Sequence, residues 1–310
     1  MDIQKVNKHQ NKLYGPTFKG ESSDRIPKLA KTLVESLVEL DSCAVAFSGG
    51  VDSSVVAQAA WLALGDRAIA VTGIGAAVSE VDLRWAREVT DFIGIRHEQI
   101  RTREIEDPDY LRNDSKRCYF CKSHLYKSAT QWGTENGFQH VLSGTNLDDL
   151  SDYRPGLVAA AEHAVIAPLA NLKIGKAEVR ALAEYWRLPV AHRPASPCLA
   201  SRIAYGQSVS EERLKRIETA EAWLHEQGFQ DVRVRLHADE LARVELADSD
   251  LLRLLAPECC KAIHESLRAI GFRYVTIDLG GRQSGSMNRA IVDSSSANLT
   301  LLHQSLPVLQ

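Results

Sequence analysis

The stretch CAVAFSGGVDSS, residues 43–54, decides the fold of this chain. Its first five residues form a short continuous apolar run, which is typical of a strand buried in a parallel sheet. Ser48, Gly49 and Gly50 follow as a glycine turn, and a helical apolar pattern begins directly after them. The backbone N–H groups of such a turn and of a helix N-terminus point toward one spot, which favours an anion. The stretch therefore predicts an anion-binding loop between a strand and a helix.

Outward from this loop, apolar runs of strand length alternate with segments of helical periodicity. We expect helices over 26–38, 51–62, 79–93 and 176–186, and strands over 43–47, 67–72, 97–100, 139–143 and 163–166. Crossover connections between parallel strands are right-handed and place helices on both faces of a sheet, so the pattern predicts an α/β fold with a doubly wound, mostly parallel sheet. Ligands of such sheets bind at the carboxyl ends of the strands.

The pattern changes after Pro194 and Pro197. Ser210 is expected to cap a helix that ends near Gly228. Strict alternation over 232–236 predicts a strand with one wet face, and the segments 241–246, 258–270 and 274–279 complete a smaller α+β domain as strand, helix and strand. We expect four parts: a flexible arm over 1–25, an α/β domain over 26–207, the α+β domain over 208–290 and a tail over 291–310.

The composition is that of an ordinary globular protein, with 45% hydrophobic and 25% charged residues. Lys and Arg number 37 against 40 Asp and Glu, so the net charge of −3 gives no support for a nucleic-acid partner. No apolar run approaches the roughly 20 residues that span a bilayer, and the first residues are too polar for a signal peptide. We therefore expect a soluble, cytoplasmic protein that makes no use of a membrane.

The glycine loop resembles the signature of the PP-loop ATP pyrophosphatases. Such proteins also carry a second segment at a strand end, which corresponds here to SGTNLDD at 143–149. No GxxxxGK[ST] motif is present, which disfavours a Walker-type kinase or ATPase. The resemblance implies cleavage of ATP to AMP and pyrophosphate, with Asp52 as a catalytic residue that contacts Mg²⁺. The residues implied to bind ATP are Ser48, Gly49, Gly50, Asp52, Ser53, Ser54, Thr72, Gly144 and Asn146.

Three of the six cysteines have a spacing that suits a metal or cluster: Cys118 and Cys121 form a CxxC, and Cys198 lies in the segment PCLASR. Three thiolates can hold a 4Fe–4S cluster with one open iron, or a zinc ion with one open position. A redox pair plus an unrelated thiol fits the spacing equally well. The other cysteines are assigned to core packing or to no site: Cys43, Cys259 and Cys260.

From about residue 26 to 290 the chain resembles the LarE family, the sulfur-inserting enzymes of nickel-pincer nucleotide cofactor synthesis. The matching segments occur in this order: AFSGGVDSS, SGTNLDD, DYRPGL, PCLASRIAYG, VRVRLH, ARVEL and YVTIDLGG. The resemblance implies that ATP activates a carboxylate of pyridinium-3,5-biscarboxylic acid mononucleotide, that sulfur replaces AMP, and that AMP and pyrophosphate are released. It identifies 26–207 as the PP-loop domain and 208–290 as the substrate-binding and assembly domain.

One branch of this family has a lone cysteine at the position of Cys198 and sacrifices its sulfur. The present chain adds Cys118 and Cys121 and is similar to the branch that binds a 4Fe–4S cluster at three cysteines. That resemblance implies a sulfide on the open iron as the nucleophile, with Cys198 as a catalytic residue, so that the enzyme turns over repeatedly.

The implied substrate carries a phosphate and two carboxylates, which guanidinium groups bind two oxygens at a time. Arg233 and Arg235 fall on one face of the alternating strand. Glu221 and Glu245 are expected to orient these arginines or to contact the ribose of the substrate. The expected substrate-binding residues are Arg154, Arg202, Glu221, Arg233, Arg235 and Glu245.

Three other functions stay open. A tRNA thiolase shares the loop and often three cluster cysteines, but it would need an RNA-binding surface, against which the acidic balance and the lack of an appended basic or zinc-ribbon segment count. An amidating synthetase would need a glutaminase-like region, and a nucleotide-binding regulator would release no pyrophosphate. The sulfur donor, the nickel enzyme served and the oligomeric state are also left open, with a homo-oligomer among the alternatives.

Overall fold

The computed structural model describes residues 24–151 and 155–283. The chain forms two compact units. The first contains the described residues up to Tyr110 together with Lys116–Pro197, and the second contains Leu111–Ser115 together with the described residues from Cys198 onward. The separate roles expected for 26–207 and 208–290 stay predictions. Nearly all of the expected arm and the whole tail, 1–25 and 291–310, lie outside the described residues.

The first unit is built on a four-stranded parallel sheet with the order β3-β2-β1-β4. Its strands are β1 (Cys43–Ala46), β2 (Ala68–Ile74), β3 (Arg96–Arg101) and β4 (His140–Leu142). In the centre of the sheet Val45 pairs with Ala70 on one side and with Leu142 on the other. The expected α/β class with a parallel sheet is confirmed.

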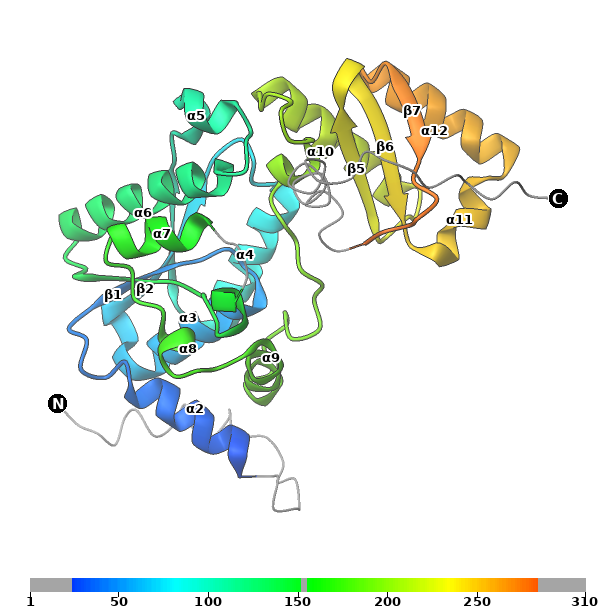
Figure 1. The fold of residues 1–310 in the computed structure, drawn as a ribbon. Helices are drawn as coiled ribbons and strands as arrows, with labels where there is room; N and C mark the ends of the chain where they lie inside the picture. The colour runs from blue at the N-terminus through cyan, green and yellow to red at the C-terminus, as the bar shows by residue number, and fades with distance from the viewer. Residues whose placement is uncertain (1–23, 152–154, 284–310) are drawn as a thin grey trace, which may run out of the picture. The chain divides into compact units, whose positions relative to one another are not determined.

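Helices cover both faces of this sheet (Figure 1). One face carries α3 (Val51–Leu64), α4 (Glu80–Ile93) and α9 (Lys176–Tyr185), with α2 (Arg25–Glu35) packed outside α3 and α9; the other carries α6 (Arg117–Glu135) and α7 (Pro155–Glu162). The short helices are α5 (Pro108–Leu111) and α8 (Pro168–Asn171). Ten of the 14 residues of α3 are buried, because this helix packs against the sheet and against α2, α4 and α9. In the described ranges no helix is long and apolar enough to cross a bilayer.

Two local expectations differ from the structure. The strand expected over 163–166 reduces to a single bridge between Ile166 and Leu142. Ala164 has a φ of 51°, which interrupts the extended conformation that a strand requires. Helix α6, which carries Cys118 and Cys121, was not among the expected helices.

The second unit packs helices against a three-stranded sheet of order β5-β6-β7. Its elements are α10 (Glu211–Glu226), β5 (Val232–His237), β6 (Leu241–Leu246), α11 (Asp248–Leu254), α12 (Pro257–Ile270) and β7 (Tyr274–Ile277). Strands β5 and β6 are antiparallel, and β7 runs parallel to β6. Ser210 caps α10 as expected, because its hydroxyl accepts from the Arg213 N–H at 3.2 Å. The apolar residues of β5 are fully buried where α10 packs, so the alternating charged residues lie on the opposite face of the sheet.

Candidate functional site

The glycine loop joins β1 to α3 at the carboxyl end of the parallel sheet. The hydroxyls of Ser53 and Ser54 both donate to the Gly50 carbonyl, at 3.1 and 2.8 Å, which fixes the first turn of the helix. Gly49 has a φ of 70°, and a Cβ there would lie 3.0 Å from the Cα of Ala86 on α4. The loop thus needs glycine both for its backbone conformation and for its close packing.

The N-terminus of α3 is open to an anion. Gly50 is the N-cap residue, and among the described residues no side chain caps this helix. The first N–H groups of a helix have no partner within the helix, so a phosphate can accept from them. These are the features that a pyrophosphate-binding loop requires.

The second expected segment packs directly against the loop. Gly144 follows β4, and a Cβ on it would lie 2.6 Å from the Ser53 nitrogen, so only glycine allows this contact. Asn146, which is 3% exposed, donates from Nδ2 to Oδ1 of Asp52 at 2.9 Å. Its own Oδ1 accepts from the Asp148 N–H at 2.9 Å, which fixes the amide orientation. The structure therefore brings Asp52, Gly144 and Asn146 together.

A lysine that the sequence analysis did not single out reaches the same carboxylate. Lys176 is the first residue of α9, and its Nζ lies 2.5 Å from Oδ2 of Asp52. A cation at a helix N-terminus opposes the helix dipole, and that anomaly was the available signal in the sequence.

Thr72 lies near the carboxyl end of β2, where its hydroxyl is engaged by protein groups. It donates to the Phe47 carbonyl at 2.9 Å and lies 2.8 Å from Nε2 of His97. Burial, reinforced by the nearby positive charge of Arg87, lowers the pKa of His97, so the neutral ring donates its Nε2–H to Thr72. Thr72 thereby ties β3 to the base of the loop, and its contact with a nucleotide stays a prediction.

The residues around the loop suit Mg²⁺. The side chain of Asp52 is 25% exposed and offers a carboxylate next to the anion site. Carboxylate and phosphate oxygens are the ligands that Mg²⁺ prefers. Asp52 would therefore hold the ion that accompanies a bound triphosphate.

The cysteines of the CxxC lie in the first turn of α6, which starts at Arg117. Residues three apart share one helix face. Cys118 is exposed and Cys121 half-buried, whereas Cys198 is exposed in the second unit, just before the 3₁₀ turn Leu199–Arg202. Among the described residues no disulfide is formed, and no three His, Cys, Asp or Glu residues form a group that could hold a metal ion. Thiolates are soft ligands of the kind that hold iron–sulfur clusters, and the role of these three cysteines as cluster ligands stays a prediction.

The remaining cysteines behave as structural residues. Burial raises the pKa of the Cys43 thiol to about 12, and this residue is fully buried in β1. The thiol of Cys260 lies 3.1 Å from the Leu254 carbonyl and donates to it. Its burial and raised pKa leave Cys43 unsuited to nucleophilic chemistry.

In the second unit, Arg202 and Glu221 form a buried two-point ion pair. Arg202 donates from Nε and Nη2 to the two carboxylate oxygens, at 3.1 and 3.2 Å. Arg202 also donates to the Cys198 carbonyl at 3.1 Å, and Glu221 accepts from the Val234 N–H at 3.0 Å. The pair therefore anchors the turn that carries Cys198 to β5.

A second buried pair joins Arg235 to Glu245. Both Nε and Nη2 of Arg235 donate to Oε2, at 3.0 and 2.7 Å, and Glu245 is 0% exposed. The other carboxylate oxygen faces Nη2 of Arg243 at 3.2 Å. Arg235 also donates to the Ser201 carbonyl at 3.2 Å, so it holds the same turn from the other side.

Arg233 differs from both. Its guanidinium is half-buried and donates to the Val232 carbonyl at 2.8 Å, and within the described ranges no carboxylate forms an ion pair with it. Burial and then the charge of Arg202 lower the pKa of Arg233 to about 10. Arg233 is thus the arginine on this face that lacks a counter-ion, whereas the sequence pattern had made it equivalent to Arg235. Arg154 lies outside the described residues.

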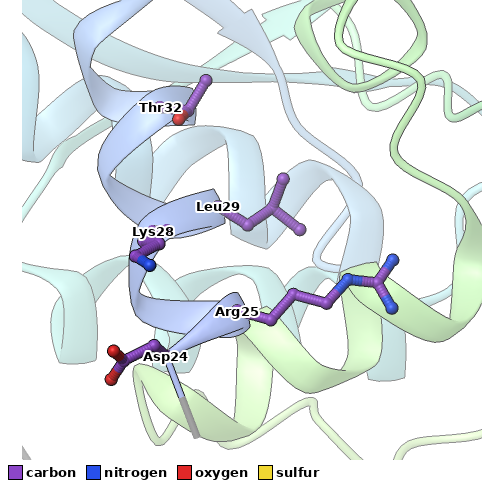
Figure 2. Close-up of a pocket in the computed structure, with 5 residues that line it drawn as sticks. All are labelled: Asp24, Arg25, Lys28, Leu29 and Thr32. Atoms are coloured by element: carbon purple, nitrogen blue, oxygen red, sulfur yellow. The ribbon is translucent and has the colours of Figure 1, made fainter. Parts of the chain in front are cut away.

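The hollow along α2 is separate from this chemistry (Figure 2). It is lined by Asp24, Arg25, Lys28, Leu29 and Thr32. Arg25 extends from it toward α9, where it pairs with Glu178. The hollow offers neither a thiol nor a glycine loop.

Comparisons with known proteins agree with this geometry. Residues 28–115, which include the loop, match the asparagine synthase family. The pyridinium-3,5-bisthiocarboxylic acid mononucleotide synthase of Lactiplantibacillus plantarum is 33% identical over 267 residues, which cover 86% of this chain and 96% of that protein. The chain belongs to the LarE family. Two further relatives are uncharacterized proteins. The one from Synechocystis sp. is 40% identical over 82% of this chain and 94% of the relative, and the one from Methanocaldococcus jannaschii is 30% identical over 60% of this chain and 72% of the relative.

Membership of the LarE family supports an ATP-using enzyme of the PP-loop superfamily that acts on a small nucleotide substrate. It agrees with the loop, the second segment and the carboxylate of Asp52 as they lie in the structure. The roles of the individual residues stay predictions.

Proposed function

We propose that this protein is an ATP-dependent sulfur insertase acting on pyridinium-3,5-biscarboxylic acid mononucleotide. A carboxylate oxygen of the substrate attacks the α-phosphorus of ATP, and the bond from that phosphorus to the bridging oxygen breaks. The electron pair leaves on pyrophosphate, and the substrate becomes an acyl adenylate. A sulfide then attacks the carbonyl carbon, AMP leaves, and a thiocarboxylate remains.

The observation that carries this proposal is the neighbourhood of Cys198. This exposed thiol starts a turn that Arg202 and Arg235, each also in a buried ion pair, hold by hydrogen bonds to backbone carbonyls. Arg233 lies near the positive charge of Arg202, and its own charge is available to a bound anion. A guanidinium without a counter-ion binds a phosphate or carboxylate of the substrate with charge-assisted hydrogen bonds. A thiol beside such an anion site suits sulfur chemistry on an anionic substrate.

Cys118, Cys121 and Cys198 are the residues we propose to hold a 4Fe–4S cluster. A cluster ligated by three thiolates leaves one iron position open, and when bound it supplies a place for an external sulfide. A redox pair would need only Cys118 and Cys121, whereas a cluster would need Cys198 as well. Replacing Cys198 therefore distinguishes a cluster from a redox pair.

The test is a set of single variants prepared anaerobically: Cys118→Ala, Cys121→Ala and Cys198→Ala. Each variant is expected to lose iron and sulfur transfer while ATP binding at the loop is retained, because the loop contains no thiol. Cys259→Ala is the matched control and is expected to keep both. Iron content, absorption and EPR spectra, thiocarboxylate formation and ATP affinity are measured on every sample.

A different pattern would overturn the cluster assignment. In that pattern only Cys198→Ala loses sulfur transfer, and the spent wild-type protein becomes lighter by the mass of hydrogen sulfide. Sulfur transfer to tRNA in place of the pyridinium nucleotide would overturn the substrate assignment.

A further inference from the structure

The chain makes a short excursion just before helix α6. Residues Leu111–Ser115 belong to the second unit, whereas their neighbours on both sides belong to the first. Helix α6, whose first turn carries Cys118 and Cys121, begins at Arg117. The chain that leads into this helix is therefore held by a unit to which the helix itself does not belong.

Asn113 is the centre of this attachment. It is 0% exposed, and its Nδ2 donates to the Ala204 and Gln207 carbonyls at 2.9 and 2.7 Å. A third contact, to the Ile203 carbonyl, measures 3.4 Å. The backbone takes part as well, because the Gly206 N–H donates to the Asn113 carbonyl at 3.1 Å. One buried residue thereby holds a complete turn of the second unit.

The residue type fits this task. Asn113 has a φ of 57°, a left-handed conformation that asparagine adopts more readily than most other residues with a side chain. Glycine would adopt it too but has no amide, and aspartate would present oxygens to the carbonyls in place of N–H donors. Asparagine supplies both the backbone conformation and the donors.

The turn that Asn113 holds is joined to Cys198 by a short, ordered path. Ile203 forms a bridge with Leu236 of β5, which fixes the far end of that path. At the near end the Ser201 N–H donates to the Cys198 carbonyl at 2.9 Å, where a 3₁₀ turn begins. Such a turn rises only about 2 Å per residue. Movement of the attached segment is therefore closely coupled to the position of Cys198.

The path from Asn113 to the other two cysteines is short as well. Cys118 follows Asn113 by five positions in the sequence. Five residues span at most about 18 Å, even when fully extended. Metal-binding groups must be held within about 0.5 Å of their working geometry, so ligands drawn from separate parts of a chain need a firm connection between those parts.

We propose that Asn113 is a positioning residue for the three-cysteine site. This inference rests on the proposed function. The amide of Asn113 holds the segment that leads to Cys118 and Cys121 against the turn that follows Cys198, so that the three thiols can meet around one cluster. Asn113 supplies no ligand and acts only through the chain on either side of it.

The experiment measures the proximity of the thiols in the reduced full-length protein before any cluster is loaded. Dibromobimane, which links two neighbouring thiols, is the probe, and peptide mass spectrometry identifies each linked pair. Asn113→Gly keeps the backbone conformation and removes the amide, whereas Asn113→Asp keeps the shape and removes the donors. Linkage of Cys118 to Cys121 is the internal control, because both lie on α6. Ile263→Val, in the buried core of α12, is the control for a general loss of stability.

Asn113→Gly is expected to slow the linkage of Cys198 to Cys118 or Cys121 roughly ten-fold or more, because the thiols lose their high effective concentration. Linkage of Cys118 to Cys121 should change less than about two-fold, since neighbours on one helix face stay neighbours. Iron bound after reconstitution should fall below about half of the wild-type amount, and ATP affinity at the glycine loop should be unchanged. Asn113→Asp should show larger losses, and Ile263→Val should match the wild type in linkage and iron.

Wild-type rates of Cys198 linkage in Asn113→Gly would overturn the proposal. Equal slowing of all linkages, or the same losses in Ile263→Val, would overturn it in favour of a general structural role. A wild type whose Cys198 linkage depends on Asn113 but which binds no iron would overturn the proposed cluster and still support the positioning role.

Discussion

Replacing Arg233 or Arg235 by Met separates substrate binding from stability. The two residues share one face of β5, but Glu245 neutralises Arg235 and no described carboxylate pairs with Arg233. Arg233→Met removes a half-buried guanidinium available to an anion. A charge-assisted hydrogen bond contributes about 1.5–3 kcal/mol, so a loss of about 2 kcal/mol should weaken binding of the pyridinium nucleotide about 30-fold.

The stability of the two variants should change in the opposite order. Arg235→Met leaves Glu245, which is 0% exposed, without its main partner. Breaking a buried pair costs about 3–5 kcal/mol, and the remaining contact from Arg243 places the expected loss near the lower end, at about 3 kcal/mol. Arg233→Met removes a charge whose burial is unfavourable, so its stability should stay within about 0.5 kcal/mol of the wild type.

Calorimetric titration with the substrate and urea unfolding are the measurements for both variants, with ATP affinity as the control that neither should change. Two results would refute the reasoning. One is an unchanged substrate affinity for Arg233→Met. The other is a fully stable Arg235→Met that loses affinity as strongly as Arg233→Met does.

Three further outcomes concern the loop. Asp52→Asn should bind AMP but release pyrophosphate at a small fraction of the wild-type rate in a coupled phosphate assay, and ADP as the main product of the wild type would contradict the PP-loop assignment. Gly144→Ala should disrupt the loop, because its Cβ would lie 2.6 Å from the Ser53 nitrogen; wild-type ATP affinity by calorimetry would contradict that packing. Because the pKa of His97 is lowered in the folded protein, the unfolded state binds more protons at this residue. The contribution of His97 to stability is therefore complete above about pH 6.5 and is lost as the pH falls toward the pKa of the folded state. His97→Gln should therefore show a flatter loss of urea stability below that pH than the wild type, and parallel profiles would contradict this origin.

The loop could be predicted from sequence because its determinants are local. An apolar strand, two glycines and a helix start lie within residues 43–54, so no distant contact is needed to recognise them. Helix α6 was missed, since RCYFCKSHLYKSATQW begins without a side-chain cap and mixes apolar and charged residues around its circumference. The strand expected over 163–166 failed at Ala164, whose positive φ cannot be read from an alanine.

The roles of site residues could be assigned only from the structure where they depend on a partner that is distant in the sequence. Alternation along β5 places Arg233 and Arg235 on one face, and the register with β6 sets Glu245 directly opposite Arg233. Only the side-chain contacts show that the Glu245 carboxylate reaches diagonally to Arg235 instead. A cation in the first turn of a helix is unusual, which marks Lys176 in the sequence, but its partner Asp52 is found only where α9 packs against α3. The partners of such charges lie far apart in the sequence, so they must be observed in the structure.

The central claim is tested most directly by the products of one anaerobic reaction containing the reconstituted protein, ATP, Mg²⁺, sulfide and pyridinium-3,5-biscarboxylic acid mononucleotide in excess. The account predicts that thiocarboxylate, AMP and pyrophosphate appear in equal amounts and exceed the amount of protein many times over. ADP in place of AMP, or AMP and pyrophosphate without any thiocarboxylate, would contradict it.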